Sequence, residues 1–165
     1  MFKDLTQFLG RLHPLLVHLP IGFILLALIF ELKRFRGKGS NFNFLQITWF
    51  IAFLSSLFSA LMGWLLAQNG HYIDTELTPH QYTGILLVLF SCVGWVLRIK
   101  NIRLPSFFSQ INNFIVLVLL IIVGHLGGSL THGSDYLTKY APDFIKLKFE
   151  KQKNYKTFEE LPLDS

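Results

Sequence analysis

The sequence predicts an all-α integral membrane protein, an antiparallel bundle of four transmembrane helices with both termini outside. Of its 165 residues 52% are hydrophobic and only 15% are charged, whereas a soluble domain carries about a quarter charged residues. The charges are also unevenly spread, because four stretches of about 20 residues contain almost none. Such a stretch, at 1.5 Å per residue, matches the ~30 Å hydrocarbon core of a bilayer.

The predicted spans occupy residues 13–32, 44–67, 79–96 and 111–133. They form a four-helix membrane domain, residues 1–140, which is followed by a polar periplasmic tail, residues 141–165. Within the first span, Pro20 should kink the helix and free the carbonyl of Leu16. Thr78 and Pro79 resemble an N-cap and a first helical position, so the third helix is expected to begin there.

Lysine and arginine indicate the orientation of the chain. The loops after the first and third spans are basic, and the middle loop contains no basic residue. The positive-inside rule therefore places both termini and the middle loop on the periplasmic side of a bacterial inner membrane. The net charge of +5 reflects these loops and the tail and does not point to nucleic acid. The inner basic residues are Lys33, Arg34, Arg36, Lys38, Arg98, Lys100 and Arg103, against Lys3, Arg11 and Lys139 outside.

All six histidines fall on the outer side in this topology. His18 and His125 should lie one or two turns below the surface, where an ionisable side chain is costly and usually functional. His13 and His71 are expected to be solvated at the interface, and both come after the other four as ligand candidates.

Three histidines have a glycine one turn deeper on the same helix face: His18 with Gly22, His80 with Gly84, and His132 with Gly128. A glycine leaves room for a flat macrocycle against the helix, which suggests a haem b pocket inside the bundle. His18 and His125 are the first predicted axial ligands, and His80 and His132 form the second pair. A copper or zinc ion bound by these histidines, or no cofactor at all, remains the alternative.

Small residues at four-residue spacing predict close helix packing. One stripe runs along the second span, and a GxxxG pair lies in the fourth. The residues are Ser55, Ser59, Gly63 and Ala67, then Gly124 and Gly128.

Three segments carry a resemblance to known membrane domains: RLHPLLVHLPIGFILLALIFE, GWLLAQNGHYIDTELTPHQYTGI and GHLGGSLTHGSDYL. The first resembles the H-P-x-x-V-H-x-P-I start of a family of uncharacterised bacterial four-helix membrane domains. The other two resemble the domain that precedes planctomycete-type cytochrome c modules. This resemblance covers residues 11 to 140 and implies a redox setting at the periplasmic face. The chain departs from that setting in one respect, since it has one cysteine, Cys92, and no CxxCH motif for a c-type haem.

Together these observations predict a membrane-embedded electron-transfer subunit that binds haem b near the periplasmic face. We expect it to act within the lipid bilayer with a c-type cytochrome or another redox subunit, and not as a complete enzyme. The alternative is a structural or metal-binding subunit of a larger respiratory complex without haem. A third reading is a quinol-oxidising site beside the haem.

Overall fold

The computed structural model of the chain is helical throughout its regular structure, as the sequence predicted. Predicted features at His71 and over most of the tail, 143–165, lie outside the described residues. The residues described are 2–37, 42–70, 72, 74–99, 105–133, 135–137 and 139–142.

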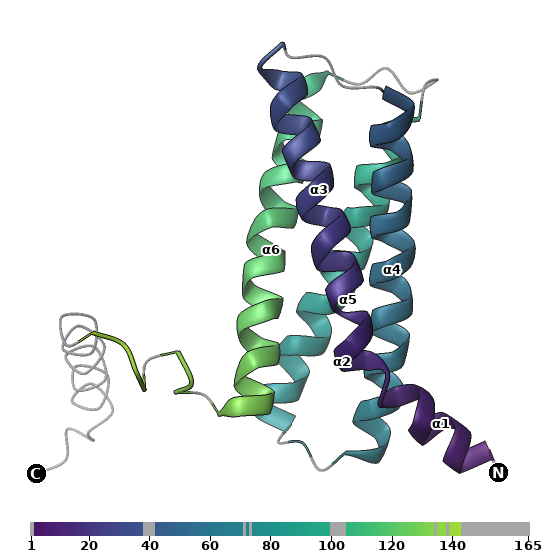
Figure 1. The fold of residues 1–165 in the computed structure, drawn as a ribbon, viewed down its shortest axis with the longest axis vertical. Helices are drawn as coiled ribbons and strands as arrows, with labels where there is room; N and C mark the ends of the chain where they lie inside the picture. Colours follow the sequence, from purple (N-terminus) through teal and green to yellow (C-terminus); the bar gives the residue numbers. More distant parts are fainter. Residues whose placement is uncertain are drawn as a thin grey trace, which may run out of the picture. The chain divides into compact units, whose positions relative to one another are not determined.

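The described residues form six helices, of which four are long, and Figure 1 shows their order along the chain. The chain forms two compact units, residues 1–127 and 128–165, and the boundary between them falls within α6. The helices are α1 Phe2–Gly10, α2 His13–Leu16, α3 His18–Phe35, α4 Phe42–Asn69, α5 Asp74–Val96 and α6 Ser106–His132.

The first predicted span is divided in two by Val17, which separates α2 from α3. This break lies one turn before Pro20, whose missing N–H removes the helical bond to Leu16. The sequence predicted a kink at Pro20, whereas the structure has a break between two helices at Val17. This break makes α2 a short separate turn that carries His13.

The start of α5 corrects the sequence-based boundary. The helix begins at Asp74, so Pro79 lies inside it and not at its first position. Glu76 falls in the first turn, where an acidic side chain complements the helix dipole. Pro79 is the sixth residue of the helix, so its missing N–H removes one helical bond, the bond to the carbonyl of Thr75.

Three helical segments are long and apolar enough to cross a membrane: residues 4–35, 43–68 and 106–132. The fourth long helix, α5, does not reach this criterion within the described residues. Its first turns contain His80 and Gln81 beside acidic and hydroxyl side chains, which lower its mean hydropathy.

The packing of residues 1–127 centres on α4, whose backbone closely approaches those of α3 and α5. α6 comes close to the other helices at few points and reaches them mainly through its side chains. The buried hydrophobic core comprises Ile24, Ala27, Leu45, Trp49, Ala52, Leu87, Val116 and Leu120.

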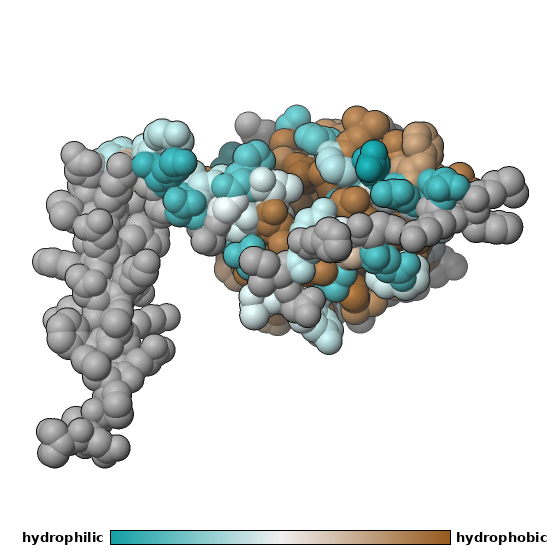
Figure 2. Space-filling model, turned by 90° about the horizontal axis from the view of Figure 1, so that it is seen from below, coloured by the Kyte–Doolittle hydropathy of each residue, from teal (hydrophilic) through white to brown (hydrophobic). Residues whose placement is uncertain are grey.

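The outer surface of the helices is apolar, as expected for a protein in contact with lipid. Large side chains such as Ile47, Leu89 and Ile121 are more than half exposed. Figure 2 shows the bundle from the end that carries α1, with polar residues interspersed over that end and hydrophobic residues around it. Apolar surface on this scale is unusual for a soluble monomer and suits a bilayer.

Candidate functional site

His13 is held against α4 by a hydrogen bond and by a glycine. Its Nδ1 lies 2.9 Å from the backbone carbonyl oxygen of Ser59. The ring also lies over Gly63, where an added Cβ would come within 2.8 Å of the His13 Cε1. Gly63 thus leaves the space in which the imidazole ring of His13 packs. The small-residue stripe of α4, which includes Ser59 and Gly63, therefore accommodates this ring.

His80, in the second turn of α5, repeats this arrangement against α6. The ring lies over Gly127, where an added Cβ would be 3.1 Å from the His80 Cε1. It also interacts with the backbone of Val123, one turn before Gly127. No hydrogen bond of good geometry reaches the buried Nδ1 of His80 within the described part of the chain.

The two histidines therefore share one arrangement. Each imidazole lies over a glycine of a facing helix, α4 for His13 and α6 for His80, and faces the backbone carbonyl of the residue four positions before that glycine. A glycine at this position exposes that carbonyl to an incoming ring. The two ring centroids are 6.4 Å apart, with planes inclined by 77°. His13 and His80 thus form a pair that joins α2, α4, α5 and α6.

The hydrogen bond of His13 fixes its tautomer. Because a carbonyl oxygen can only accept, Nδ1 of His13 carries the proton and Nε2 presents a lone pair. Metal-bound histidines in proteins are usually oriented in this way, with the second ring nitrogen bonded to a carbonyl or carboxylate. His13 therefore presents one ring nitrogen, Nε2, whose lone pair could bind a metal.

The distance between the rings also suits a shared metal. Two imidazoles that each bind one metal through a nitrogen at about 2.0–2.1 Å have ring centroids roughly 5–6.5 Å apart, and the upper value holds when they lie on opposite sides of the metal. The observed 6.4 Å is close to this value.

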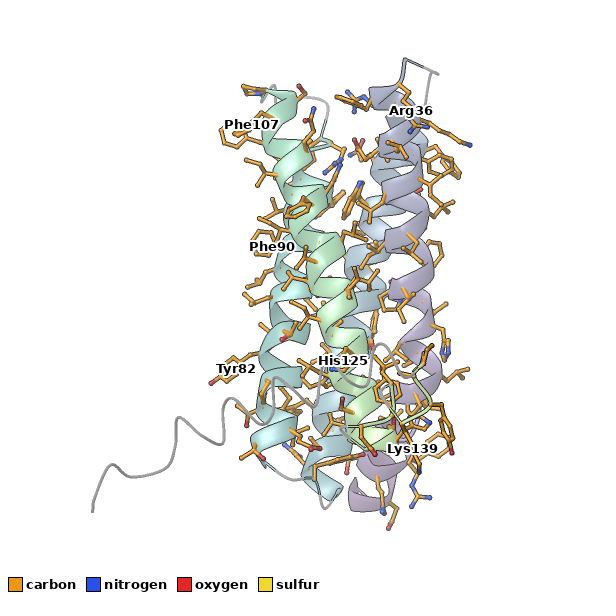
Figure 3. All side chains as sticks on the ribbon, turned by 90° about the vertical axis from the view of Figure 1, so that its left-hand side faces the viewer. Arg36, Tyr82, Phe90, Phe107, His125 and Lys139 are labelled. Atoms are coloured by element: carbon orange, nitrogen blue, oxygen red, sulfur yellow. The ribbon has the colours of Figure 1, made fainter. Side chains whose placement is uncertain are left out.

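The histidines that the sequence ranked first lie elsewhere. His18 is exposed, with its Nδ1 3.2 Å from the Leu15 carbonyl oxygen on its own segment. His125 is exposed on α6, toward the end opposite Arg36 and Phe107 (Figure 3). His132, in the second compact unit, is exposed and lies 2.7 Å from the Thr131 hydroxyl through its Nδ1. Of the four predicted ligands, only His80 is brought together with another histidine, and its partner is His13.

The predicted glycine pairs are not contacts between histidine and glycine. Nothing lies within 4 Å of a Cβ added at Gly22, and the same holds for Gly124. Gly84 faces the Val123 side chain at 4.0 Å, and Gly128 faces the ring of Tyr136. The Gly124–Gly128 pair therefore forms no close helix contact among the described residues. The role of Gly22, Gly84 and Gly128 beside a haem stays a prediction.

Among the described residues, no group of three His, Cys, Asp or Glu side chains converges on one point. The histidine pair could supply two protein ligands at most. Zinc sites normally require three or four protein ligands, whereas a haem iron takes four nitrogens from the porphyrin and needs only two axial ligands.

A second polar centre lies at the other end of the bundle, around Arg98. This residue follows α5 and is 1% exposed, and its Nε donates to Glu31 of α3 over 2.7 Å. Nη1 donates to the Gly94 carbonyl and Nη2 to the Asn113 side chain of α6. The guanidinium carbon also lies 4.7 Å from the Trp49 ring centroid, a cation–π contact. Burial lowers the pKa of Arg98, while the hydrogen bond and charge of Glu31 raise it.

The sequence analysis did not predict the His13–His80 pair or the Arg98–Glu31 ion pair, for the same reason. It placed His13 at the solvated interface and Arg98 in a loop. The position of a residue along a span predicts its depth in the membrane but not the direction in which its side chain points. One signal was present: each paired histidine begins one long segment, and its glycine lies near the end of the next.

Comparison with known families identifies the membrane context. Residues 11–136 match the family described as predicted membrane protein (DUF2231). The chain belongs to this family. The match includes His13, Gly63, His80 and Gly127, and it confirms the prediction of a membrane protein. No curated protein and no solved structure matched the chain.

Proposed function

We propose that this DUF2231 chain is a membrane-embedded electron-transfer subunit that binds haem b through His13 and His80. The observation that supports the proposal is the shared packing of the two imidazoles. Each ring lies over a glycine of a neighbouring helix, and the two ring centroids are 6.4 Å apart. This assignment keeps His80 from the sequence-based set and replaces His18 and His125 with His13.

The side chains present fit such a group. The Ser59 carbonyl orients His13 and leaves its Nε2 free, and the buried Nδ1 of His80 has no hydrogen-bond partner of good geometry among the described residues. When bound, haem iron supplies a one-electron couple. The chain would hold the iron, exclude water through the surrounding apolar helices, and keep both imidazoles neutral.

The proposed topology places this pair near the periplasm. We infer four membrane crossings with both ends of the chain outside. The fourth crossing is α5, whose hydropathy is below that of the other three. The basic residues of the inner loops support this orientation. The partner would then be a c-type cytochrome or another redox subunit at the periplasmic face, as the sequence resemblance implies.

The test is an optical spectrum of protein expressed with a haem precursor. We expect a Soret band and a low-spin spectrum with two axial imidazoles. His13→Gly and His80→Gly should each lose the low-spin spectrum or become high-spin, and added imidazole should restore it, because it can occupy the vacated position.

The matched controls are His18→Gly and His125→Gly, which should keep the wild-type spectrum. A wild-type protein without haem under these conditions would end the proposal. Normal spectra in both His13→Gly and His80→Gly would instead return the ligand assignment to His18 and His125.

A further inference from the structure

The first helix, α1, is not needed for a membrane crossing. Residues 4–35 together have the length and hydropathy of one membrane span. These 32 residues would measure roughly 48 Å as one straight helix, whereas the hydrocarbon core is about 30 Å thick. The part from His13 to Phe35 already extends about 35 Å and can cross the bilayer alone. The nine residues of α1 therefore have a different position.

One face of α1 is apolar and open. Its side chains follow the spacing i, i+3, i+4 and i+7, which is typical of an amphipathic helix. They are Leu5, Phe8, Leu9 and Leu12, the last in the turn that follows the helix. Leu5 is 53% exposed and Phe8 is 62% exposed, so the described residues leave most of this face uncovered.

The polar residues and the contact with α4 occupy the other two faces of α1. Asp4, Gln7 and Arg11 are all exposed and share one face. Gly10 is buried on the remaining face, where an added Cβ would come within 2.7 Å of the backbone nitrogen of Leu66. One face of α1 thus packs on α4, while the apolar and the polar faces are exposed beside it.

The contact with α4 places α1 at the level of a membrane surface. Gly10 packs on Leu66, which is two residues, or about 3 Å along the helix axis, from Trp64. Trp64 is 57% exposed and lies near the end of α4. An exposed tryptophan near the end of a membrane helix marks the headgroup level. Figure 1 shows α1 running obliquely away from the axis of α3 at this end of the bundle.

The apolar face of α1 continues into the lipid-facing surface of the bundle. Leu15 in α2 and Leu19 in α3 follow Leu12 at helical spacing, and both are large, exposed apolar side chains. A surface that faces acyl chains along α3 therefore extends without interruption onto α1.

We propose that α1 lies in the lipid–water interface at the histidine end of the bundle. Its apolar face, with Leu5 and Phe8, rests among the acyl chains of that leaflet, and its polar face lies among the headgroups. An amphipathic helix in this position buries its apolar face by about 5–10 Å at the boundary between headgroups and acyl chains.

This position of α1 also fixes the depth of His13. Gly10 packs on Leu66 and His13 packs on Gly63, so the two contacts are three residues apart along both segments. With α1 held at the interface, the His13 ring lies one helical turn, or about 5 Å, deeper in the membrane.

Nitroxide labels on single cysteines test the proposal, in a Cys92→Ser background reconstituted into phosphatidylcholine vesicles. The variants are Leu5→Cys and Phe8→Cys on the apolar face, and Asp4→Cys and Gln7→Cys on the polar face. Oxygen concentrates in lipid, whereas a nickel chelate stays in water. We expect the ratio of oxygen to nickel collisions to be several-fold higher on the apolar face, with those labels about 5–10 Å deep.

Leu25→Cys is the control, because this exposed residue lies near the middle of α3 and its label should be deeper than any label on α1. Equal nickel access at all four α1 positions would place the helix in water. Low access of both reagents at Leu5 and Phe8 would show that protein, such as a second copy of the chain, covers the apolar face. Either result would overturn the proposal, and neither depends on whether haem is bound.

Discussion

At the scale of single residues, the glycines of this protein have different roles that their sequence context does not reveal. Gly63 and Gly127 receive histidine rings, and Gly94 receives the ring of Trp49. Gly22 faces nothing within 4 Å. The same residue type is therefore indispensable at one helix position and replaceable at another, and the neighbouring side chain decides which.

This contrast gives a direct prediction for Gly63→Ala. The new methyl group would overlap His13, so the ring must leave its seat or the helices must separate. We expect a loss of about 1–3 kcal/mol of stability, the usual cost of overpacking. Thermal unfolding in detergent measures it.

Gly22→Ala is the control, because alanine favours a helix by up to about 1 kcal/mol over glycine. It should leave the melting temperature unchanged or raise it. Equal effects of the two substitutions would show that Gly63 is not the seat of His13.

At the scale of helices, the Arg98 centre joins elements that otherwise meet through apolar contacts. Its guanidinium connects α3 through Glu31, α6 through Asn113 and α4 through Trp49. A buried ion pair contributes little net stability, but the loss of one partner leaves the other charge uncompensated.

We therefore expect Glu31→Leu to destabilise the bundle by about 3–5 kcal/mol. The double variant Glu31→Leu with Arg98→Met should recover most of this loss, because neither charge then remains buried. Chemical or thermal unfolding in detergent gives the comparison.

Arg36→Ala, at an exposed position near the same end, should change stability by no more than about 0.5 kcal/mol. If the double variant were as unstable as Glu31→Leu alone, the ion pair would not be the cause of the loss.

At the scale of the whole molecule, the decisive question is which end of the bundle faces outward. Lys38, in the loop after the first span, and Asp74, at the start of α5, belong to opposite ends of the bundle in the proposed topology. In a Cys92→Ser background, Lys38→Cys should react with a membrane-impermeant thiol reagent only from the cytoplasmic side. Asp74→Cys should react only from the periplasmic side. The reverse pattern would place the histidine pair at the cytoplasmic face and would contradict the proposed periplasmic partner.

The sequence anticipated much of the architecture, because hydrophobic length and proline chemistry are local properties. It predicted the helical class, four long helices within a few residues of their ends, and a kink at Pro20 where the structure has a break at Val17. It erred at the start of α5, where the acidic first turn extends the helix beyond the Thr78–Pro79 signal. It also named His80 as a candidate ligand, although with different partners.

The sequence by itself determined that this chain is a helical membrane protein, since about twenty uncharged apolar residues in a row have few other stable solutions. Only the tertiary structure decided which polar side chains meet. Rotation of a helix about its own axis changes neither its hydropathy nor its length, yet it decides whether His18 or His13 faces the interior. That rotation is set by contacts across helices, such as the His13 ring on Gly63 and the Arg98 guanidinium on Glu31. Residues far apart in the sequence make these contacts, so the candidate site became visible only in the folded bundle.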